Sequence, residues 1–401
     1  YALSTCAAMA TLAGCGGSQP PIGANDSPAQ RTSRVNNLPD HGRKASNYRV
    51  LYSFGNPPNG SDPLAALINV GGKLYGTTSE GGIYSSLGTL GTIFSITPSG
   101  NENVLYSFQG GSDDGQNPVA ALINVNGALY GTTQEGGPNG IFGGSVFSIT
   151  TSGREKVLHF FGNSKDGIWP YASLLDVNGT FYGTTNGRGT YNCPSFPGCG
   201  TVFSITKDGT ERVLHSFGGK RDGAFPAAGL IDVNGTLYGT TSGGGEHATK
   251  KAPNEGGVVF SITPGGKEKV LHSFGDGSDG AVPDGGLIDV NGTLYGTTRN
   301  GGAYYNSCGN GVACGTVFRI TTVGKENVLY SFGYGYTAGC LPRAPLVDVK
   351  GTLYGTASAC GPFHESGEGN GTIFSVTTAA QRLRYTALVK ERGTAGDLLP
   401  G

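Results

Sequence analysis

The chain alternates short apolar runs with stretches of Gly, Asn and Pro, and this alternation repeats six times. Each copy opens on a run such as Leu-His-Ser-Phe-Gly, at spacings of 53 to 58 residues. It continues with a Pro, a Leu-Ile-Asp-Val run, an Asn-Gly pair, Leu-Tyr-Gly-Thr-Thr, a variable loop and Gly-Thr-Val-Phe-Ser-Ile-Thr, or close relatives of these. Such self-similarity marks a repeat architecture in which each copy forms one structural unit. The copies begin at Leu51, Leu105, Leu158, Leu214, Leu271 and Leu329.

Four short strands are predicted in every copy. The runs are rich in β-branched and aromatic residues and are bounded by Gly, Pro or Asn. Asn234-Gly235 predicts a type I′ hairpin, because that turn needs positive φ at both central residues. In the fourth copy the predicted strands are 228–233, 236–241, 257–263 and 268–274.

Six such units predict an all-β fold, a six-bladed β-propeller of four-stranded antiparallel blades. Stacking the blades around an axis buries their faces, and closing the ring protects the strand edges. An open β-solenoid is the alternative, but its coils are usually shorter and lack two hairpins per repeat. Two segments compete to supply the closing strand, 49–54 and the less regular 382–388.

Composition excludes several other classes of protein. The 73 Gly follow no three-residue period, which excludes collagen, and the apolar runs between them argue against disorder. The net charge of -1, with only 14% charged residues, offers no basic stripe for nucleic acid. No apolar run reaches the ~18 residues that a transmembrane helix needs. The composition therefore indicates a globular body with a nearly neutral, polar surface.

The first 15 residues are predicted to be a secretory signal, although a basic n-region is missing from the sequence. A short run of apolar and small residues precedes Cys15 and is too short to span a membrane. The run ends in Leu-Ala-Gly-Cys, which resembles a bacterial lipobox, so Cys15 is the predicted lipidation site. An ordinary signal peptide cut nearby is the alternative.

The residues after Cys15 resemble outer-membrane sorting signals, since no Asp follows the cysteine. We therefore expect an outer-membrane lipoprotein at the cell surface or in the periplasm, attached to the membrane through its lipid anchor only. The predicted organisation is a signal and lipobox over 1–15, a flexible tether over 16–47, the six-repeat propeller over 48–390 and a disordered tail over 391–401.

Six further cysteines lie in the repeat region, and export to an oxidising compartment favours disulfides between them. Two pairs are six residues apart in equivalent loops, and the third pair lies in two loops expected on the same face. A zinc site is the alternative, but no CxxC spacing occurs and no His is near the first two pairs. The predicted bridges are Cys193–Cys199, Cys308–Cys314 and Cys340–Cys360.

The combination of Asn-Gly-Thr-Leu-Tyr-Gly-Thr-Thr, Gly-Thr-Val-Phe-Ser-Ile-Thr and Leu-His-Ser-Phe-Gly resembles the GloVer tandem-repeat proteins, named among bacterial "choice-of-anchor" surface proteins. The resemblance covers 49–378 almost continuously. It implies export, surface attachment and a repeat scaffold, and it brings no catalytic residues. The last copy departs from the pattern, with Thr-Ala for Thr-Thr and Lys350 for Asn, which suggests a modified closing blade.

Because strand direction alternates, the Asp-Gly…Pro loops and the variable loops are expected to share one face, where function should lie. Aromatic rings in the variable loops can stack on sugars or anchor a peptide. The alternative is that they pack down and order their own loops. The candidate ligand-binding residues are Tyr84, Phe142, Tyr191, Phe196, Tyr304, Tyr305, Phe363, His364 and Glu365.

In four of the six copies an Asp stands four residues before the Pro. A ring of carboxylates can bind Ca²⁺, but Asp before Gly also caps its own backbone in an Asx-turn. The turn is favoured because Asn59 and Ala338 replace the Asp in the first and last copies, and a local Ca²⁺ site stays open. We predict no other cofactor. These carboxylates are Asp114, Asp166, Asp222 and Asp279.

Three histidines, His159, His215 and His272, take the place that Tyr holds in the other copies. Convergence on a metal is one interpretation. Exchange with Tyr favours another, in which each flat ring packs between blades and its polar tip finds one hydrogen bond. No metal site is therefore predicted.

We expect a non-catalytic recognition or scaffold module that binds glycan, peptide or a surface protein through the variable-loop face. The alternative is a polysaccharide-active hydrolase or lyase, which needs two carboxylates roughly 5–10 Å apart at the propeller mouth. Two loops break the repeat with ionisable residues, for which solvated charge is the favoured interpretation. These residues are His247, Lys250, Lys251, His364, Glu365 and Glu368. The ligand and the oligomeric state do not follow from the sequence.

Overall fold

The computed structural model describes most of the repeat region. The described residues are 49–55, 58–84, 90–138, 143–163, 165–193, 198–218, 221–248, 256–276, 278–304, 314–333, 339–360 and 371–378. The chain divides into two compact units, Tyr1–Arg49 and Val50–Gly401, and the repeats lie in the second. The predicted signal, the lipobox at Cys15, the tether and the tail lie outside the described residues.

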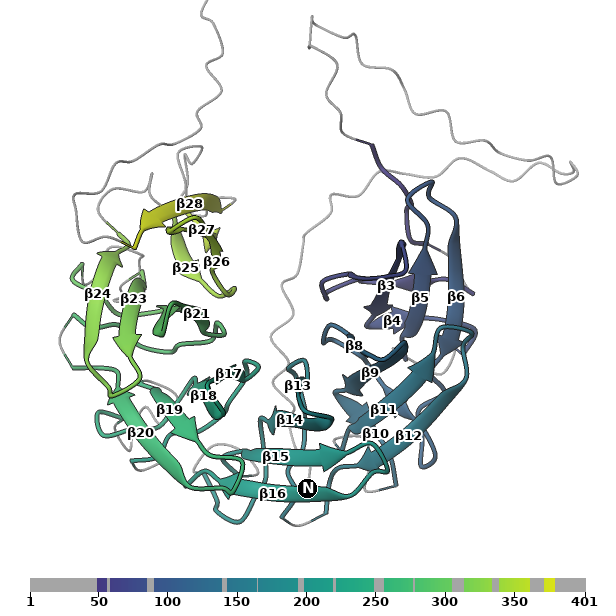
Figure 1. The fold of residues 1–401 in the computed structure, drawn as a ribbon, viewed down its shortest axis with the longest axis horizontal. Helices are drawn as coiled ribbons and strands as arrows, with labels where there is room; N and C mark the ends of the chain where they lie inside the picture. Colours follow the sequence, from purple (N-terminus) through teal and green to yellow (C-terminus); the bar gives the residue numbers. More distant parts are fainter. Residues whose placement is uncertain are drawn as a thin grey trace, which may run out of the picture. The chain divides into compact units, whose positions relative to one another are not determined.

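Every regular element in these ranges is a β-strand (Figure 1). Within them no helix is long and apolar enough to cross a membrane. The expectation of an all-β protein is therefore confirmed.

Five of the copies form four-stranded antiparallel sheets in which sequence neighbours pair. Sheet 1 contains β2 (Ile68–Val70), β3 (Lys73–Thr78), β5 (Thr92–Ile96) and β6 (Glu102–Ser107). Sheet 2 contains β8 (Ile123–Val125), β9 (Ala128–Thr133), β11 (Ser145–Thr150) and β12 (Glu155–Phe160). Sheet 3 contains β13 (Leu175–Val177), β14 (Thr180–Thr185), β15 (Thr201–Thr206) and β16 (Glu211–Ser216). Sheet 4 contains β17 (Ile231–Val233), β18 (Thr236–Thr241), β19 (Val258–Ile262) and β20 (Glu268–Ser273). Sheet 5 contains β21 (Ile288–Val290), β22 (Thr293–Thr298), β23 (Thr316–Thr321) and β24 (Glu326–Ser331).

The sixth copy differs from the others. Its strands β26 (Val347–Val349), β27 (Thr352–Ala359) and β28 (Thr372–Thr377) match the first three strands of the other sheets. A further strand, β25 (Cys340–Pro342), pairs with the end of β27. Among the described residues no fourth strand pairs with β28.

The Asn-Gly pairs form the hairpins that the sequence predicts. Asn234 and Gly235 have φ of 54° and 79°, as a type I′ turn requires. Asp232 adds a side-chain bond, because its Oδ1 accepts from the Gly235 backbone N–H at 2.9 Å. An equivalent Asx–Gly bond recurs in all six copies, so it also holds the turn where Lys350 replaces Asn.

Consecutive sheets are joined by two recurring contacts. The second strand of each of sheets 1–5 carries a Thr whose hydroxyl donates to a carbonyl of the next copy; Thr240 Oγ1, for example, lies 3.3 Å from Gly285 O. A Phe directly after or at the end of each fourth strand also packs against a Phe of the next sheet; Phe217 packs edge-on against Phe260, with centroids 5.2 Å apart. Both of these rings are fully buried. The apolar core therefore lies mainly between sheets.

The loop that joins one sheet to the next, called the aspartate loop here, has an unusual backbone. The residue before its Pro has positive φ in all six copies, although it is never Gly. Val282, with φ of 58°, is the most strained of them because its Cβ is branched. Hydrogen bonds on both sides hold it: its N–H donates to Gly256 O of the preceding copy at 2.6 Å, and its carbonyl accepts from Arg299 N at 2.9 Å.

Candidate binding site on the variable-loop face

The variable loop, between the second and third strands of a copy, lies beside the aspartate loop of the same copy. The two are joined by short antiparallel pairing in every copy, for example Gly115 with Gly136 and Ala224 with Gly243. In the sixth copy the same pairing joins Cys340 to Ala359. The expectation that these loops share one face is therefore confirmed.

Only part of the candidate ligand-binding set is described. Tyr84, Tyr191 and Tyr304 are described, and so is His247 of the fourth loop. The candidates outside the described residues are Phe142, Phe196, Tyr305, Phe363, His364 and Glu365, together with Lys250, Lys251 and Glu368.

The described rings and His247 occupy one equivalent position in their copies, which the predicted site did not include as a group. Each stands six residues after the second Thr of its Leu-Tyr-Gly-Thr-Thr run. This constant spacing in the sequence identifies His247 as the equivalent of the three tyrosines. The four residues at this position, called lid residues here, are Tyr84, Tyr191, His247 and Tyr304.

The lid residues differ in exposure. Tyr84 is half-buried and packs in a hydrophobic cluster with Tyr106. It therefore orders its own loop, as the alternative interpretation predicts. Tyr304 is 38% exposed, and Tyr191 is the most exposed of the three tyrosines at 54%. The ring of Tyr191 is thus the best placed to contact a ligand.

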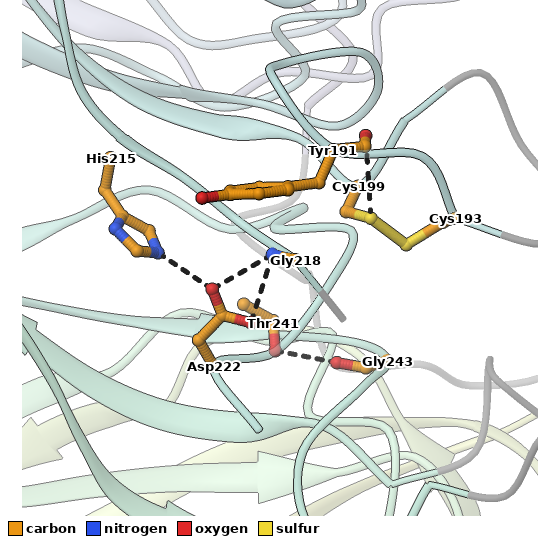
Figure 2. The surroundings of a disulfide bond; sticks show 8 residues. All are labelled: Tyr191, Cys193, Cys199, His215, Gly218, Asp222, Thr241 and Gly243. Atoms are coloured by element: carbon orange, nitrogen blue, oxygen red, sulfur yellow. Dashed lines mark hydrogen bonds and ion pairs between the residues drawn. A yellow bond between two sulfur atoms is a disulfide. The ribbon is translucent and has the colours of Figure 1, made fainter. Parts of the chain in front are cut away.

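Sheet 3 carries the clearest site. A pocket of about 360 Å³ is lined by Thr190 and Tyr191 from the variable loop and by His215, Gly218 and Asp222 from the end of β16 and the aspartate loop. The ring of Tyr191 extends toward His215 and Asp222 (Figure 2). It lies across Gly218, since a methyl group built there would be 3.6 Å from Tyr191 Cδ2.

A disulfide fixes the loop that holds Tyr191. Cys193 and Cys199 are bonded with an S–S distance of 2.06 Å, as predicted. Sγ of Cys199 also lies 3.9 Å from the carbonyl oxygen of Tyr191. Tyr191 stands two residues before Cys193, so the bridge restrains the segment that follows it, and this restraint lowers the entropy that the exposed ring loses on binding.

The wall below Tyr191 is a hydrogen-bonded pair. His215 Nε2 lies 3.2 Å from Asp222 Oδ2, and the same carboxylate accepts from the Gly218 N–H at 2.9 Å. His215 also packs edge-on against Phe217, with centroids 4.9 Å apart. Each predicted packing histidine makes one such bond to an Asp seven residues later, so that interpretation is confirmed. The pairs are His159–Asp166, His215–Asp222 and His272–Asp279, with Tyr106–Asp114 as the tyrosine version.

The recurring aspartates cap backbone N–H groups, but mostly not in the predicted direction. Asp166 Oδ1 accepts from Gly162, four residues earlier, and Asp279 does the same from Gly275. Only Asp114 also accepts from the residue that follows it, Gly115. Burial raises the pKa of Asp114, while bonds from Gln109 and Tyr106 oppose that shift. The carboxylates therefore close the aspartate loop and orient the ring above it.

Each of these four pairs lies beside a glutamate of the next sheet, a residue that the sequence did not predict at the site. Glu211, at the start of β16, lies beside His159 of β12 in sheet 2 and beside Asp166 of the aspartate loop that joins sheet 2 to sheet 3. Burial raises its pKa to about 7, and the Asp166 charge adds to the shift while His159 opposes it. Its Oε1 is buried and has no hydrogen-bond partner. The same raised pKa of about 7 and orphaned oxygen recur at Glu155, Glu268 and Glu326.

Sheet 4 has an equivalent pocket with a different lining. It encloses about 650 Å³ and is lined by Arg221, Glu246, His247, His272, Asp276 and Asp279. His247 replaces the tyrosine lid and lies over Gly275, as Tyr191 lies over Gly218. The lid side chain is therefore an imidazole in the sheet 4 pocket and a phenol ring in the sheet 3 pocket.

Within the described ranges no cluster of three or more His, Cys, Asp or Glu side chains has the arrangement to hold a metal ion. The second described disulfide, Cys340–Cys360, joins β25 to the residue after β27 with an S–S distance of 2.00 Å, as predicted. Cys314 is also disulfide-bonded. Its predicted partner Cys308 lies outside the described residues.

The chain belongs to the Gloeobacter/Verrucomicrobia repeat family. The family model matches residues 42–252, 85–309 and 247–398, so overlapping matches cover the whole repeat region. This confirms the resemblance seen in the sequence. Membership of a bacterial repeat family, together with the disulfides, indicates a location in the periplasm or outside the cell. No curated protein matches the chain.

Solved structures give distant likenesses. The PQQ-bound aldose sugar dehydrogenase from Streptomyces coelicolor has a TM-score of 0.39 at 14% identity, over 82% of this chain and 96% of that one. A luciferin-regenerating enzyme has a TM-score of 0.39 at 14% identity, over 76% and 87%. A protein of unknown function from Bacteroides thetaiotaomicron has a TM-score of 0.42 at 12% identity, over 81% and 72%. At these scores no activity is transferred to this chain.

Proposed function

We propose that the protein is an exported, non-catalytic recognition module that binds a glycan through its variable-loop face. The observation that carries this proposal is the exposed ring of Tyr191, which stands beside a disulfide-closed loop and above a hydrogen-bonded His–Asp pair. A sugar ring has an apolar C–H side and a hydroxylated rim. An aromatic face suits the first, and fixed polar groups beside it suit the second.

The scaffold supports this role. The copies keep their strands alike while the loops around the lid position differ, so the neighbouring pockets of sheets 3 and 4 present Tyr191 and His247 on similar strands. A peptide or a surface protein anchored by the same rings is the other ligand class that this face suits.

A glycan array tests the proposal directly. Wild-type protein should bind a defined set of glycans, and Tyr191→Ala should lower the affinity at least about tenfold, the loss expected for one central aromatic contact. Tyr191→Phe, which keeps the ring, should retain most of the binding. Val323→Ser, in the turn between β23 and β24, is the matched control and should change nothing. An array and a peptide display screen that both gave no ligand would overturn the proposal.

The architecture proposed for this module is a closed six-bladed propeller. Its support comes from two uncovered faces. Tyr354 and Ile373 of the sixth copy are 42% and 80% exposed, whereas their equivalents in the other sheets are buried. Leu67 of sheet 1 is 48% exposed, whereas its equivalent Leu122 is 2% exposed. In the other sheets, the residues equivalent to Tyr354 and Ile373 are buried against the following sheet. The exposed face of the sixth copy can therefore pack on the exposed face of sheet 1 as consecutive sheets pack elsewhere.

Lipid attachment at Cys15 and residence at the outer membrane complete the proposal. In a bacterial host, wild-type protein should partition into the membrane fraction, and Cys15→Ala should move it to the soluble exported fraction with glycan binding intact. If wild type and Cys15→Ala partition equally between the two fractions, the proposed lipid anchor at Cys15 is wrong.

The sheet 4 pocket favours a second candidate, a polysaccharide-active hydrolase or lyase. Glu246, Asp276 and Asp279 line it beside two histidines, which supplies acid and base groups. Release of reducing ends or unsaturated products from a polysaccharide panel, lost in Glu246→Gln or Asp279→Asn, would support this candidate over simple binding.

A further inference from the structure

The third strand of the sixth copy is incomplete on one side. In sheets 1–5 each third strand is paired on both sides, whereas β28 pairs only with β27 in the part of the chain that the structure describes. Its Ile373 is 80% exposed, whereas the equivalent side chains of the other five sheets are fully buried. A strand edge and an apolar side chain are thus left uncovered together. The buried equivalents are Ile93, Val146, Val202, Val259 and Val317.

The segment Val50–Gly55 lies against sheet 1 as a fourth strand lies against the sheet that follows it. Phe54 packs on Phe94 with centroids 5.0 Å apart, the contact that Phe217 makes on Phe260. Tyr52 is hydrogen-bonded to Glu102. The equivalent residues of sheets 2 and 3, His159 and Glu211, also lie beside each other.

A close backbone contact also places Val50–Gly55 in the position of a fourth strand. A Cβ built on Gly100 would lie 2.5 Å from the Leu51 carbonyl oxygen, so only Gly fits there. The other four pairs of this kind join a Gly to the equivalent Leu of a true fourth strand at 2.4 to 2.8 Å. They are Gly153 with Leu105, Gly209 with Leu158, Gly266 with Leu214 and Gly324 with Leu271. The Val-Leu-Tyr-Ser-Phe run of 50–54 is also identical to those of 104–108 and 328–332.

We propose that Val50–Phe54 is the fourth strand of the sixth sheet and pairs antiparallel with β28. The inference rests on the proposed closure of the propeller and adds which segment closes it and in which register. In the five complete sheets the third and fourth strands pair with one register and one bulge, as Thr92 with Ser107 and Ile93 with Tyr106. The same register places Ser53 opposite Thr372 and Tyr52 opposite Ile373, which covers the exposed side chain.

The proposed register supplies a sharp cross-linking experiment. Phe108 N donates to Gly91 O at 3.1 Å, so Thr92 and Ser107 form a non-hydrogen-bonded pair, the kind whose side chains approach most closely. The equivalent pair, Ser53→Cys with Thr372→Cys, should therefore form an intramolecular disulfide in the full chain. Ser53→Cys with Ile373→Cys is the control and should stay reduced, because neighbouring residues of a strand point to opposite faces. Peptide mapping under non-reducing conditions distinguishes the new bridge from the native ones.

A second pair separates this inference from closure itself. Tyr130 of sheet 2 stacks on Phe181 of sheet 3 with centroids 4.4 Å apart, and the equivalent residues across the closing interface are Tyr354 and Leu74. A short bifunctional thiol reagent should join cysteines placed at these two positions, because ring contact alone does not bring the Cα atoms within disulfide range. If the reagent joins Leu74→Cys to Tyr354→Cys while Ser53→Cys and Thr372→Cys form no disulfide, the ring closes through another segment and the inference is wrong. If neither pair cross-links, closure is wrong too. A Ser53–Thr372 bridge found only between two molecules would make a second copy the occupant of the β28 edge, and would also overturn the inference.

Truncation provides a readout that does not depend on cysteine chemistry. If Val50–Phe54 closes the sheet, removing residues 382–401 should leave the melting temperature within about 2 °C of the full chain, the size of a neutral surface change. A large fall in melting temperature would assign the closing strand to 382–388 instead. Glycan binding measured on the same variants reports on the proposed function separately.

Discussion

At the scale of single residues, one polar arrangement recurs with the repeat. A His or Tyr of the fourth strand bonds an Asp of the aspartate loop, as in His215–Asp222 and Tyr106–Asp114. Either ring can satisfy the carboxylate: the longer Tyr106 bonds an Asp eight residues later, and the shorter His215 bonds one seven residues later. The sequence shows the exchange of His and Tyr, and this predicted a packed ring with one hydrogen bond. It did not reveal the acceptor, because the Asp was interpreted as a local turn residue.

The exchange predicts which substitution the fold tolerates. His215→Tyr should leave the free energy of unfolding nearly unchanged, since Tyr106 makes the same bond to Asp114. His215→Phe keeps the ring but removes the donor, and should lower the free energy of unfolding by about 1–2 kcal/mol. Urea denaturation of the two variants beside the wild type measures the difference. Equal losses would mean that ring shape, and not the hydrogen bond, matters at this position.

The glutamates beside these pairs predict an unusual dependence of stability on pH. Burial raises the pKa of Glu155, Glu211, Glu268 and Glu326 to about 7, against an ordinary value of 4.5. A carboxyl whose pKa is higher in the folded state binds more protons there than in the unfolded chain. Its stabilisation is therefore complete below pH 4.5 and is lost as the pH rises through 7.

The melting temperature should accordingly fall by several degrees between pH 5 and pH 8. Circular dichroism melts across this range check the prediction. Glu211→Gln with Glu268→Gln should flatten the profile, because an amide stays neutral throughout. A melting temperature that rises with pH over the same interval would contradict the assignment of raised pKa values.

At the scale of elements, the local sequence predicts the strands and turns well. In the fourth copy the structure has strands at 231–233, 236–241, 258–262 and 268–273, inside or within one residue of the predicted limits. Periodic apolar runs and Asn-Gly pairs carry this information directly. The positive φ of Val282 was not predictable, because hydrogen bonds to the neighbouring copy impose it on a residue that prefers an extended backbone.

The hairpin turns allow a stabilising substitution. Lys350 has φ of 53° in the place where Asn234 has 54°. Asn tolerates the left-handed region better than Lys, so Lys350→Asn should raise the free energy of unfolding by a few tenths of a kcal/mol up to about 1 kcal/mol. Asn234→Lys should cost a similar amount. Chemical denaturation of both variants checks the pair, and a loss of stability in Lys350→Asn would contradict the turn assignment.

The contacts between sheets predict a larger effect. Phe260 is fully buried and packs on Phe217 of the preceding sheet. Phe260→Ala should therefore lower the free energy of unfolding by about 3–5 kcal/mol, as large core truncations do. Val323→Ser, at an exposed turn, should change it by less than about 0.5 kcal/mol. A loss below 1 kcal/mol in Phe260→Ala would show that the sheets are stable without their shared core.

At the scale of the whole molecule, consecutive sheets pack through apolar clusters that lie between them, and in every copy the variable loop lies beside the aspartate loop. The sequence predicts the number of copies, their four strands and the shared face, because each follows from spacing and strand direction. The pocket lining was only partly predictable. Tyr191 was identified as a candidate, but its partner His215 comes from the end of β16 and Asp222 from the aspartate loop that leads to sheet 4, so their convergence depends on the tertiary fold.

The central claim is that a glycan binds on the variable-loop face and not on the face of short turns. Photo-cross-linking of a bound array ligand, followed by peptide mapping, tests this most directly. The account predicts labelled peptides that contain Tyr191 or the 213–222 segment. Labelling confined to the Asn-Gly turns, such as Asn234-Gly235 and Asn291-Gly292, would contradict it.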